Sequence, residues 1–273
     1  MAGFPRAGST LLSNILNQNP EFLGTATSGL IGTFINVRDN WRQSDIYKSN
    51  PEEYIYSKIQ SLLKNIICGF YEDELSNDII PIDKNRGWTG FIDLLEEIFQ
   101  CKIKIIFPIR NIIDILISME KVNRKSTATN HGDNGNWLNE QTTIGRAENF
   151  LKDDGILGLP MLRFREILYR KQLDRLVIVS YDNLLNHPRK TLDKIHEELE
   201  IELFNYDLNN IKQTIVEHDL DHGFSPNSLH KIKEGRILPP KQRDTMVFDS
   251  NYINQIENER YKDISQLINN IKI

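Results

Sequence analysis

The 273-residue sequence has few cysteines, no long apolar run and no excess of positive charge. Cys68 and Cys101 are too few for a disulfide framework, and we expect both to be reduced packing residues. No apolar stretch reaches the roughly 18 to 20 residues that span a bilayer, and no secretory signal is visible. The net charge of −5 disfavours nucleic acid or an anionic membrane as a partner. We therefore expect a cytoplasmic protein with neither partner, in which any anion site is built locally.

The composition and length fit one ordinary globular domain. Apolar residues make up 39% and charged residues 26%, which is typical of a folded chain rather than a disordered one. No internal repeat or low-complexity linker divides the sequence. We predict a single domain over residues 1–273.

Apolar patterning predicts strands that alternate with helices. Short apolar runs predict strands at 78–83, 102–107 and 175–181, the second of which Pro108 should stop. Helical periodicity covers 11–16, 54–70, 91–99, 111–122 and 188–199. This alternation predicts an α/β protein with three layers, in which helices flank a central parallel sheet. Two segments poor in apolar residues, 126–139 and 222–242, have the length of lids over a ligand.

The first ten residues contain a phosphate-binding pattern. Gly3, Gly8 and Thr10 fit the spacing of G-x-x-x-x-G-K-[ST], but Ser9 stands where that motif has lysine. Backbone N–H groups at the start of the following helix can still bind an anion. Arg6 can replace the missing positive charge with a planar fork of donors. A sulfuryl group carries less charge than a phosphoryl group, and we expect its transfer here without a metal ion.

The run GFPRAGSTLL resembles the 5′-phosphosulfate loop of sulfotransferases that use 3′-phosphoadenosine 5′-phosphosulfate (PAPS). The longer run through Asn19-Pro20 and residues 25–28 is similar to bacterial and phage members related to the tyrosylprotein sulfotransferases. The resemblance implies a P-loop-type fold and PAPS as co-substrate. It also implies that the loop binds the phosphosulfate through Arg6, Ala7, Gly8, Ser9 and Thr10.

Two further segments match the family. Arg110 ends a predicted strand, and Ser118 lies two turns into the next helix, a layout that resembles the family's 3′-phosphate motif. Lys84, after another predicted strand, resembles the lysine that touches the oxygen between sulfate and phosphate. The resemblance therefore assigns Lys84 and Arg6 to catalysis and Arg110 with Ser118 to the 3′-phosphate. Lys231, Lys233 and Arg236 form a basic segment that either closes over the nucleotide or is a solvated charge run.

Two features depart from the family pattern. The family has a strand before the phosphate loop, and the two residues ahead of Gly3 leave no room for it. Loss of this strand would expose neighbouring strand edges. We expect the strand to come from upstream sequence; a neighbouring chain that supplies it and a compromised protein are the alternatives. The stretch Gly24–Ser28, where the family has a catalytic glutamate, contains no carboxylate. His131, Glu140 and Asp83 are candidate replacements for that base.

The sequence thus predicts transfer of a sulfuryl group from PAPS to an acceptor hydroxyl or amine. A nucleotide-binding protein with this fold but no catalysis is the first alternative. A P-loop kinase or NTPase is the second, and Ser9 in place of the lysine disfavours it. The acceptor class and the oligomeric state stay open.

Overall fold

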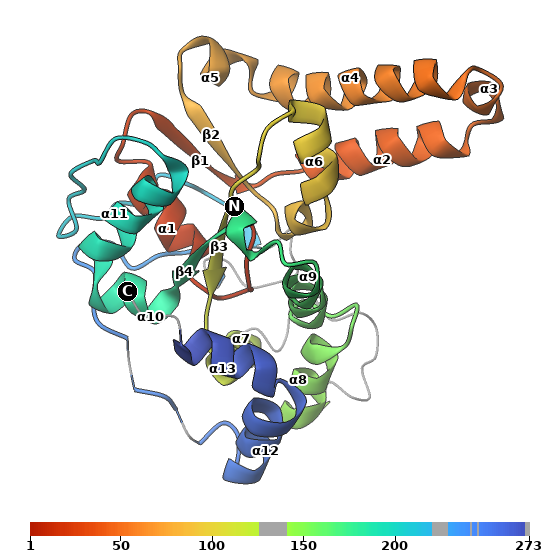
Figure 1. Cartoon of the computed structure of the whole chain (residues 1–273). Coiled ribbons are helices and arrows are strands. Elements are labelled where there is room, and N and C mark those ends of the chain that lie inside the picture. The colour runs from red at the N-terminus through yellow and green to blue at the C-terminus, as the bar shows by residue number, and fades with distance from the viewer. Residues whose placement is uncertain (126–140, 220–228, 241, 245, 271–273) are drawn as a thin grey trace.

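The computed structural model describes residues 1–125, 141–219, 229–240, 242–244 and 246–270. Its strands form two parallel pairs (Figure 1). Strand β1 (Phe22–Thr27) pairs with β2 (Ile80–Lys84), and β3 (Ile105–Ile109) pairs in register with β4 (Leu176–Ser180). The predicted parallel sheet is confirmed, and β2, β3 and β4 lie at the three predicted places. Strand β1 was not predicted, because Gly24 and two threonines weaken its apolar pattern.

Residues 1–4 lie between the two pairs. Ala2 N–H donates to Ile106 O and Phe4 N–H to Pro108 O, each at 2.9 Å. On the other side Asn85 N–H donates to Met1 O at 3.0 Å. The segment is too short to count as a strand, as the sequence indicated, but its backbone occupies the strand position between β2 and β3. Residues 1–4 therefore cover both strand edges over their own length, and the expected upstream continuation of the strand stays a prediction.

Pro108 does not stop β3, which continues to Ile109. Proline has no N–H to donate, and its ring needs space on the side where the sheet would continue. Gly3 gives that space, since a Cβ there would lie 2.8 Å from Pro108 Cδ and 2.3 Å from Pro108 O. The carbonyl of Pro108 still accepts a hydrogen bond from Phe4, so the segments stay paired.

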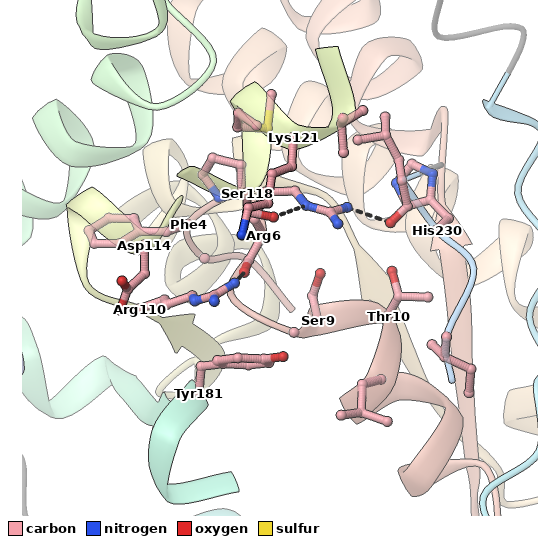
Figure 2. Close-up of a pocket in the computed structure, with 18 of the residues that line it drawn as sticks. Phe4, Arg6, Ser9, Thr10, Arg110, Asp114, Ser118, Lys121, Tyr181 and His230 are labelled. Carbon is pink, nitrogen blue, oxygen red and sulfur yellow. Dashed lines mark hydrogen bonds between the residues drawn. The ribbon is translucent and has the colours of Figure 1, made fainter. Parts of the chain in front are cut away.

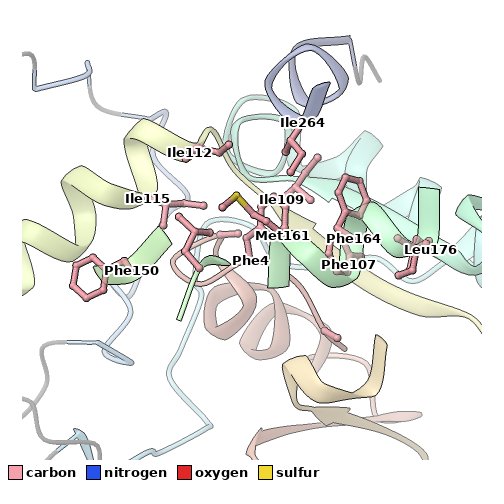
Figure 3. Close-up of a cluster of buried hydrophobic side chains, with 14 of the residues drawn as sticks. Phe4, Phe107, Ile109, Ile112, Ile115, Phe150, Met161, Phe164, Leu176 and Ile264 are labelled. Carbon is pink, nitrogen blue, oxygen red and sulfur yellow. The ribbon is translucent and has the colours of Figure 1, made fainter. Parts of the chain in front are cut away.

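Side chains alternate between the two faces of the sheet and enter two separate cores. Phe4, Phe107 and Ile109 face one core, where Phe4 and Phe107 pack against Phe164 with ring centroids 5.2 to 5.7 Å apart (Figure 3). Met1 and Ile106 face the other core. Period-two alternation with both faces apolar is what a buried sheet requires. The three-layer arrangement is therefore confirmed.

Helices cover both faces (Figure 1). The face with Met1 carries α1 (Ser9–Leu16), α10 (Tyr181–Asn186) and α11 (Pro188–Leu199). The face with Phe4 carries α2 (Leu30–Gln43), α4 (Glu52–Phe70), α6 (Ile92–Phe99), α7 (Ile112–Lys125), α8 (Thr143–Leu151), α9 (Gly158–Tyr169), α12 (Ser250–Asn254) and α13 (Lys262–Asn270). Short helices α3 (Asp45–Lys48) and α5 (Glu72–Ser76) flank α4, which runs beside α2 as a hairpin. Within the described ranges, no helix is long and apolar enough to cross a bilayer.

Candidate functional site

A cavity of about 1140 Å³ opens at the carboxyl ends of the strands, where ligands bind in parallel α/β sheets (Figure 2). The phosphate loop, Lys84, Arg110 and Ser118 all line it. The structure thus brings together the residues that the sequence analysis selected from three separate segments. The basic residues Lys231, Lys233 and Arg236 line the same cavity, so they belong to its wall whether or not they touch a nucleotide.

The phosphate loop places the start of α1 at the wall of this cavity. Gly8 is the residue before α1 and has φ = 84°, the left-handed region that favours glycine. A Cβ at Gly8 would lie 2.6 Å from a ring carbon of Tyr181, so the loop also needs glycine for space. No described side chain caps the helix, which leaves the first-turn N–H groups beside Ser9 and Thr10 for an anion. Ala7 is the exception among the predicted residues, because its side chain is buried in the core.

Arg6 is the centre of the polar contacts at the loop. Its Nε donates to Ser118 Oγ at 3.1 Å, and its Nη1 donates to Leu229 O. Arg110 donates from Nη1 to Arg6 O at 3.1 Å and stacks its guanidinium 4.4 Å from the ring centroid of Tyr181. Burial, and then the nearby charge of Arg110, lower the pKa of Arg6 from its ordinary value. The contacts join the three predicted anion-binding side chains into one cluster (Figure 2).

The cluster fits a ligand with several negative charges. In the described part of the chain, neither Arg6 nor Arg110 forms a salt bridge with a carboxylate. Arg110 Nε is also buried and has no hydrogen-bond partner among the described residues. Two guanidinium groups held close together repel each other, and an anion between them would relieve that repulsion. The residues therefore suit the phosphosulfate and 3′-phosphate groups that the sequence analysis assigned to them.

Lys84 ends β2 as predicted, but it has a partner that the sequence analysis missed. Its Nζ lies 2.8 Å from Glu217 Oε2, and both side chains are at least nine-tenths buried. Thr27 N–H donates to the same oxygen at 3.3 Å, so Glu217 supplies a carboxylate beside the stretch that has none of its own. Burial alone would raise the pKa of Glu217, but the hydrogen bond and charge of Lys84 lower it to about 2.

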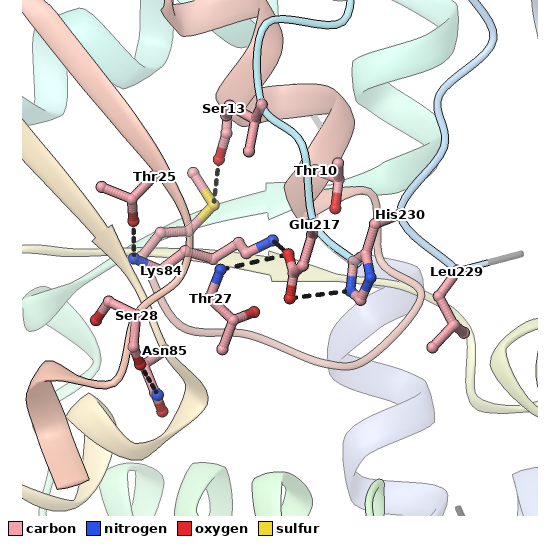
Figure 4. A network of polar contacts seen from close by, with 12 residues as sticks. Thr10, Ser13, Thr25, Thr27, Ser28, Lys84, Asn85, Glu217, Leu229 and His230 are labelled. Atoms are coloured by element: carbon pink, nitrogen blue, oxygen red, sulfur yellow. Dashed lines mark hydrogen bonds and ion pairs between the residues drawn. The ribbon is translucent and has the colours of Figure 1, made fainter. Parts of the chain in front are cut away.

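Glu217 also lies beside His230 (Figure 4). His230 in turn forms a second ionisable pair with Asp219. His230 Nε2 lies 3.5 Å from Glu217 Oε1, and His230 Nδ1 lies 2.7 Å from Asp219 Oδ1. Asp219 Oδ2 accepts a hydrogen bond from Leu229 N–H at 3.0 Å. Burial is the largest influence on His230 and lowers its pKa from the ordinary value of 6.5. Lys84, Glu217 and His230 line the cavity, whereas Asp219 is not part of its wall.

Of the three predicted candidates for the catalytic base, the structure describes only Asp83. His131 and Glu140 lie outside the described residues. Asp83 does not line the cavity. Its carboxylate accepts hydrogen bonds from Ser28 Oγ, Tyr71 OH and Trp88 Nε1 at 2.5 to 2.6 Å, which makes it a structural acceptor. The sequence analysis did not select Glu217, Asp219 or His230. The only sequence signal for them was the run Glu217-His218-Asp219, in a segment without helical or strand periodicity.

Comparisons with known proteins identify the family of this chain. A model of the sulfotransferase domain family matches residues 1–236. No curated protein sequence matches the chain. Among solved structures, the sulfotransferase domain from the Synechococcus PCC 7002 olefin synthase is 20% identical, with a TM-score of 0.49, over 98% of this chain and 91% of that chain. The sulfotransferase domain from the curacin biosynthetic pathway is 15% identical, with a TM-score of 0.47, over 74% and 73%. Because the family model covers well over half of its residues, the chain belongs to the sulfotransferase domain family.

Proposed function

We propose that this chain transfers the sulfuryl group of PAPS to a hydroxyl or amine of an acceptor. The observation that carries the proposal is the cluster of Arg6, Arg110 and Ser118 at the open N-terminus of α1. A helix N-terminus and two guanidinium groups suit one ligand with phosphate groups at both ends of a nucleoside. The absence of the P-loop lysine disfavours an ATP-dependent kinase or NTPase.

Each residue has a separate role in this proposal. The loop N–H groups and Arg6 hold the 5′-phosphosulfate, and Arg110 with Ser118 holds the 3′-phosphate. When bound, PAPS supplies the activated sulfuryl group. Lys84 stabilises the charge that grows on the leaving phosphate, as donors aimed at a developing charge do. For this role Lys84 must turn at least one N–H from Glu217 toward the ligand, which three ammonium donors allow.

Several finer assignments belong to the same proposal. The loop and the run through residues 25–28 resemble the branch related to the tyrosylprotein sulfotransferases, which favours a phenolic acceptor for the first trials. We further propose that the reaction needs no metal, that the protein acts in the cytoplasm, and that neither nucleic acid nor a membrane is its partner. The net charge of −5 supports the last point.

Calorimetric titration with PAP, the product nucleotide, tests the proposal directly. AMP lacks the 3′-phosphate, and Mg-ATP is the ligand of a P-loop kinase, so both are controls. We expect tight binding of PAP and weak binding of both controls. Preference for Mg-ATP would refute the assignment, and PAP binding without sulfation of any phenol, alcohol or amine would favour the non-catalytic alternative.

A further inference from the structure

The geometry points to His230 as the group that accepts the acceptor's proton, with Asp219 as the residue that positions it. This inference rests on the proposed sulfuryl transfer, and it deepens that function by naming a base. The base was the one catalytic role that the sequence analysis left without a residue.

The contacts of His230 hold its ring in the state that a base requires. Asp219 is 1% exposed, and its Oδ2 already accepts from Leu229 N–H. Its Oδ1 therefore accepts from His230 Nδ1, which places the ring proton on Nδ1 and leaves the Nε2 lone pair free of a proton. Nε2 lies 3.5 Å from Glu217 Oε1, and both residues line the cavity. An imidazolium formed by protonation at Nε2 would have one carboxylate beside each ring nitrogen, and both would stabilise its charge.

His230 also lies beside the predicted position of the sulfuryl group. Leu229 precedes it, and one residue thus makes two contacts: its N–H binds Asp219 and its carbonyl accepts from Arg6 Nη1. The same short segment therefore positions Arg6, which is assigned to the sulfonate, and the pair formed by His230 and Asp219. Figure 2 shows the side chain of Arg6 extending from the loop toward the segment that carries His230.

The neighbouring carboxylates are less suitable as bases. Glu217 has a pKa lowered to about 2, because Lys84 outweighs burial, and a group this acidic takes a proton poorly near neutral pH. Asp83 is occupied by three donors and lies outside the cavity wall. Among the described residues, Glu217, Asp219 and Lys84 face His230. Burial keeps its pKa below the ordinary value, so the ring is neutral near pH 7. A neutral imidazole of this kind is the usual general base at that pH.

The step balances without any further reactant. The acceptor oxygen forms a bond to sulfur, while the bond from sulfur to the 5′-phosphate oxygen breaks and its electron pair leaves with PAP. The acceptor O–H proton moves to Nε2 of His230 and is then lost to solvent. For an amine acceptor the same nitrogen takes the N–H proton.

The first test needs no acceptor. A long-range ¹H–¹⁵N spectrum of the ¹⁵N-labelled protein reports the tautomer and pKa of each of the six histidines, and H230Q identifies the signal of His230. We expect a neutral ring with its proton on Nδ1 at pH 7, and a shift toward the other tautomer in D219N. A ring that is cationic at pH 7, or that carries its proton on Nε2, would overturn the proposal.

The second test measures release of PAP from PAPS with phenols of graded pKa, and with water as acceptor where no phenol is sulfated. H230Q should lower kcat/KM by about 10²- to 10⁴-fold with un-ionised acceptors. The loss should be much smaller for 4-nitrophenol, which is already ionised at pH 8. D219N should show the same pattern with a smaller loss. The matched control is H218Q, because His218 is exposed in the same segment and does not line the cavity.

Binding separates the possible failures. H230Q should bind PAP as wild type does, since His230 is assigned to the acceptor's proton. If wild type binds PAP and turns over but H230Q is equally active, this inference is wrong and the proposed function stands. If wild type does not bind PAP, the proposed function itself fails. An equal loss for all acceptors, whatever their pKa, would show a structural role rather than a base.

Discussion

Replacing Arg110 by methionine tests the 3′-phosphate site most sharply. The substitution keeps an unbranched stem over the ring of Tyr181 but removes the charge and every donor. Arg110 has two separable roles here: Nη1 donates to Arg6 O at 3.1 Å and supports the loop, while the rest of the guanidinium is assigned to the ligand. Only the second role depends on a 3′-phosphate.

The two roles give different losses for two ligands. Hydrogen bonds to a charged group contribute about 1.5 to 3 kcal/mol, so loss of the 3′-phosphate contact should raise the Kd for PAP by about 10- to 150-fold. The bond from Arg110 to the Arg6 carbonyl supports the loop for either ligand, so its loss should weaken PAP and AMP binding alike. The Kd for PAP should therefore rise by about 10- to 150-fold more than the Kd for AMP.

Calorimetry of wild type and R110M with PAP and with AMP gives four values of Kd, which form a thermodynamic cycle. The difference between the binding free energies that PAP and AMP lose isolates the 3′-phosphate contact. R189M is the matched control, because Arg189 donates to the Phe204 and Tyr206 carbonyls and does not line the cavity. Equal fold-losses for PAP and AMP in R110M would refute the assignment of Arg110. A loss in R189M of the same size would show that the effect is general destabilisation.

Three further substitutions test the loop, the buried ion pair and the core. G8A forces φ = 84° on a residue with a Cβ and places that Cβ 2.6 Å from the Tyr181 ring, so we expect a lower Tm and weaker PAP binding; unchanged values for both would contradict the loop geometry. Lys84, against the effect of burial, lowers the pKa of Glu217 from 4.5 to about 2, so the stability from this carboxylate is present above pH 4.5 and is lost as the pH falls toward 2. In urea titrations E217Q should therefore lose less stability than wild type between pH 5 and pH 2.5, and parallel losses would refute the pairing. F4A removes a ring that is 2% exposed and should cost about 3 to 5 kcal/mol of unfolding free energy; a cost below about 1 kcal/mol would mean that this ring is poorly packed.

Local pattern in the sequence determined much of the site. The spacing of Gly3, Gly8 and Thr10 places a helix N-terminus at a tight turn, and such a motif depends only on neighbouring residues. Arg110 and Ser118 follow from a strand that runs directly into a helix. The apolar runs of β3 and β4 were readable because burial on both faces gives near-continuous apolar residues. Strand β2 is only partly buried and was readable from its short apolar run alone.

The tertiary structure alone decided what depends on contacts between distant segments. The partner of Lys84 is 133 residues away along the chain, and no periodicity marks the segment that carries it. The pairing of residues 1–4 on both sides of the sheet and the fit of Gly3 against Pro108 likewise need the neighbouring strands in place. Side-chain direction belongs to the same class, as Ala7 shows by turning into the core beside residues that face the cavity. A local motif fixes which backbone groups can bind an anion, but only packing decides which charges meet.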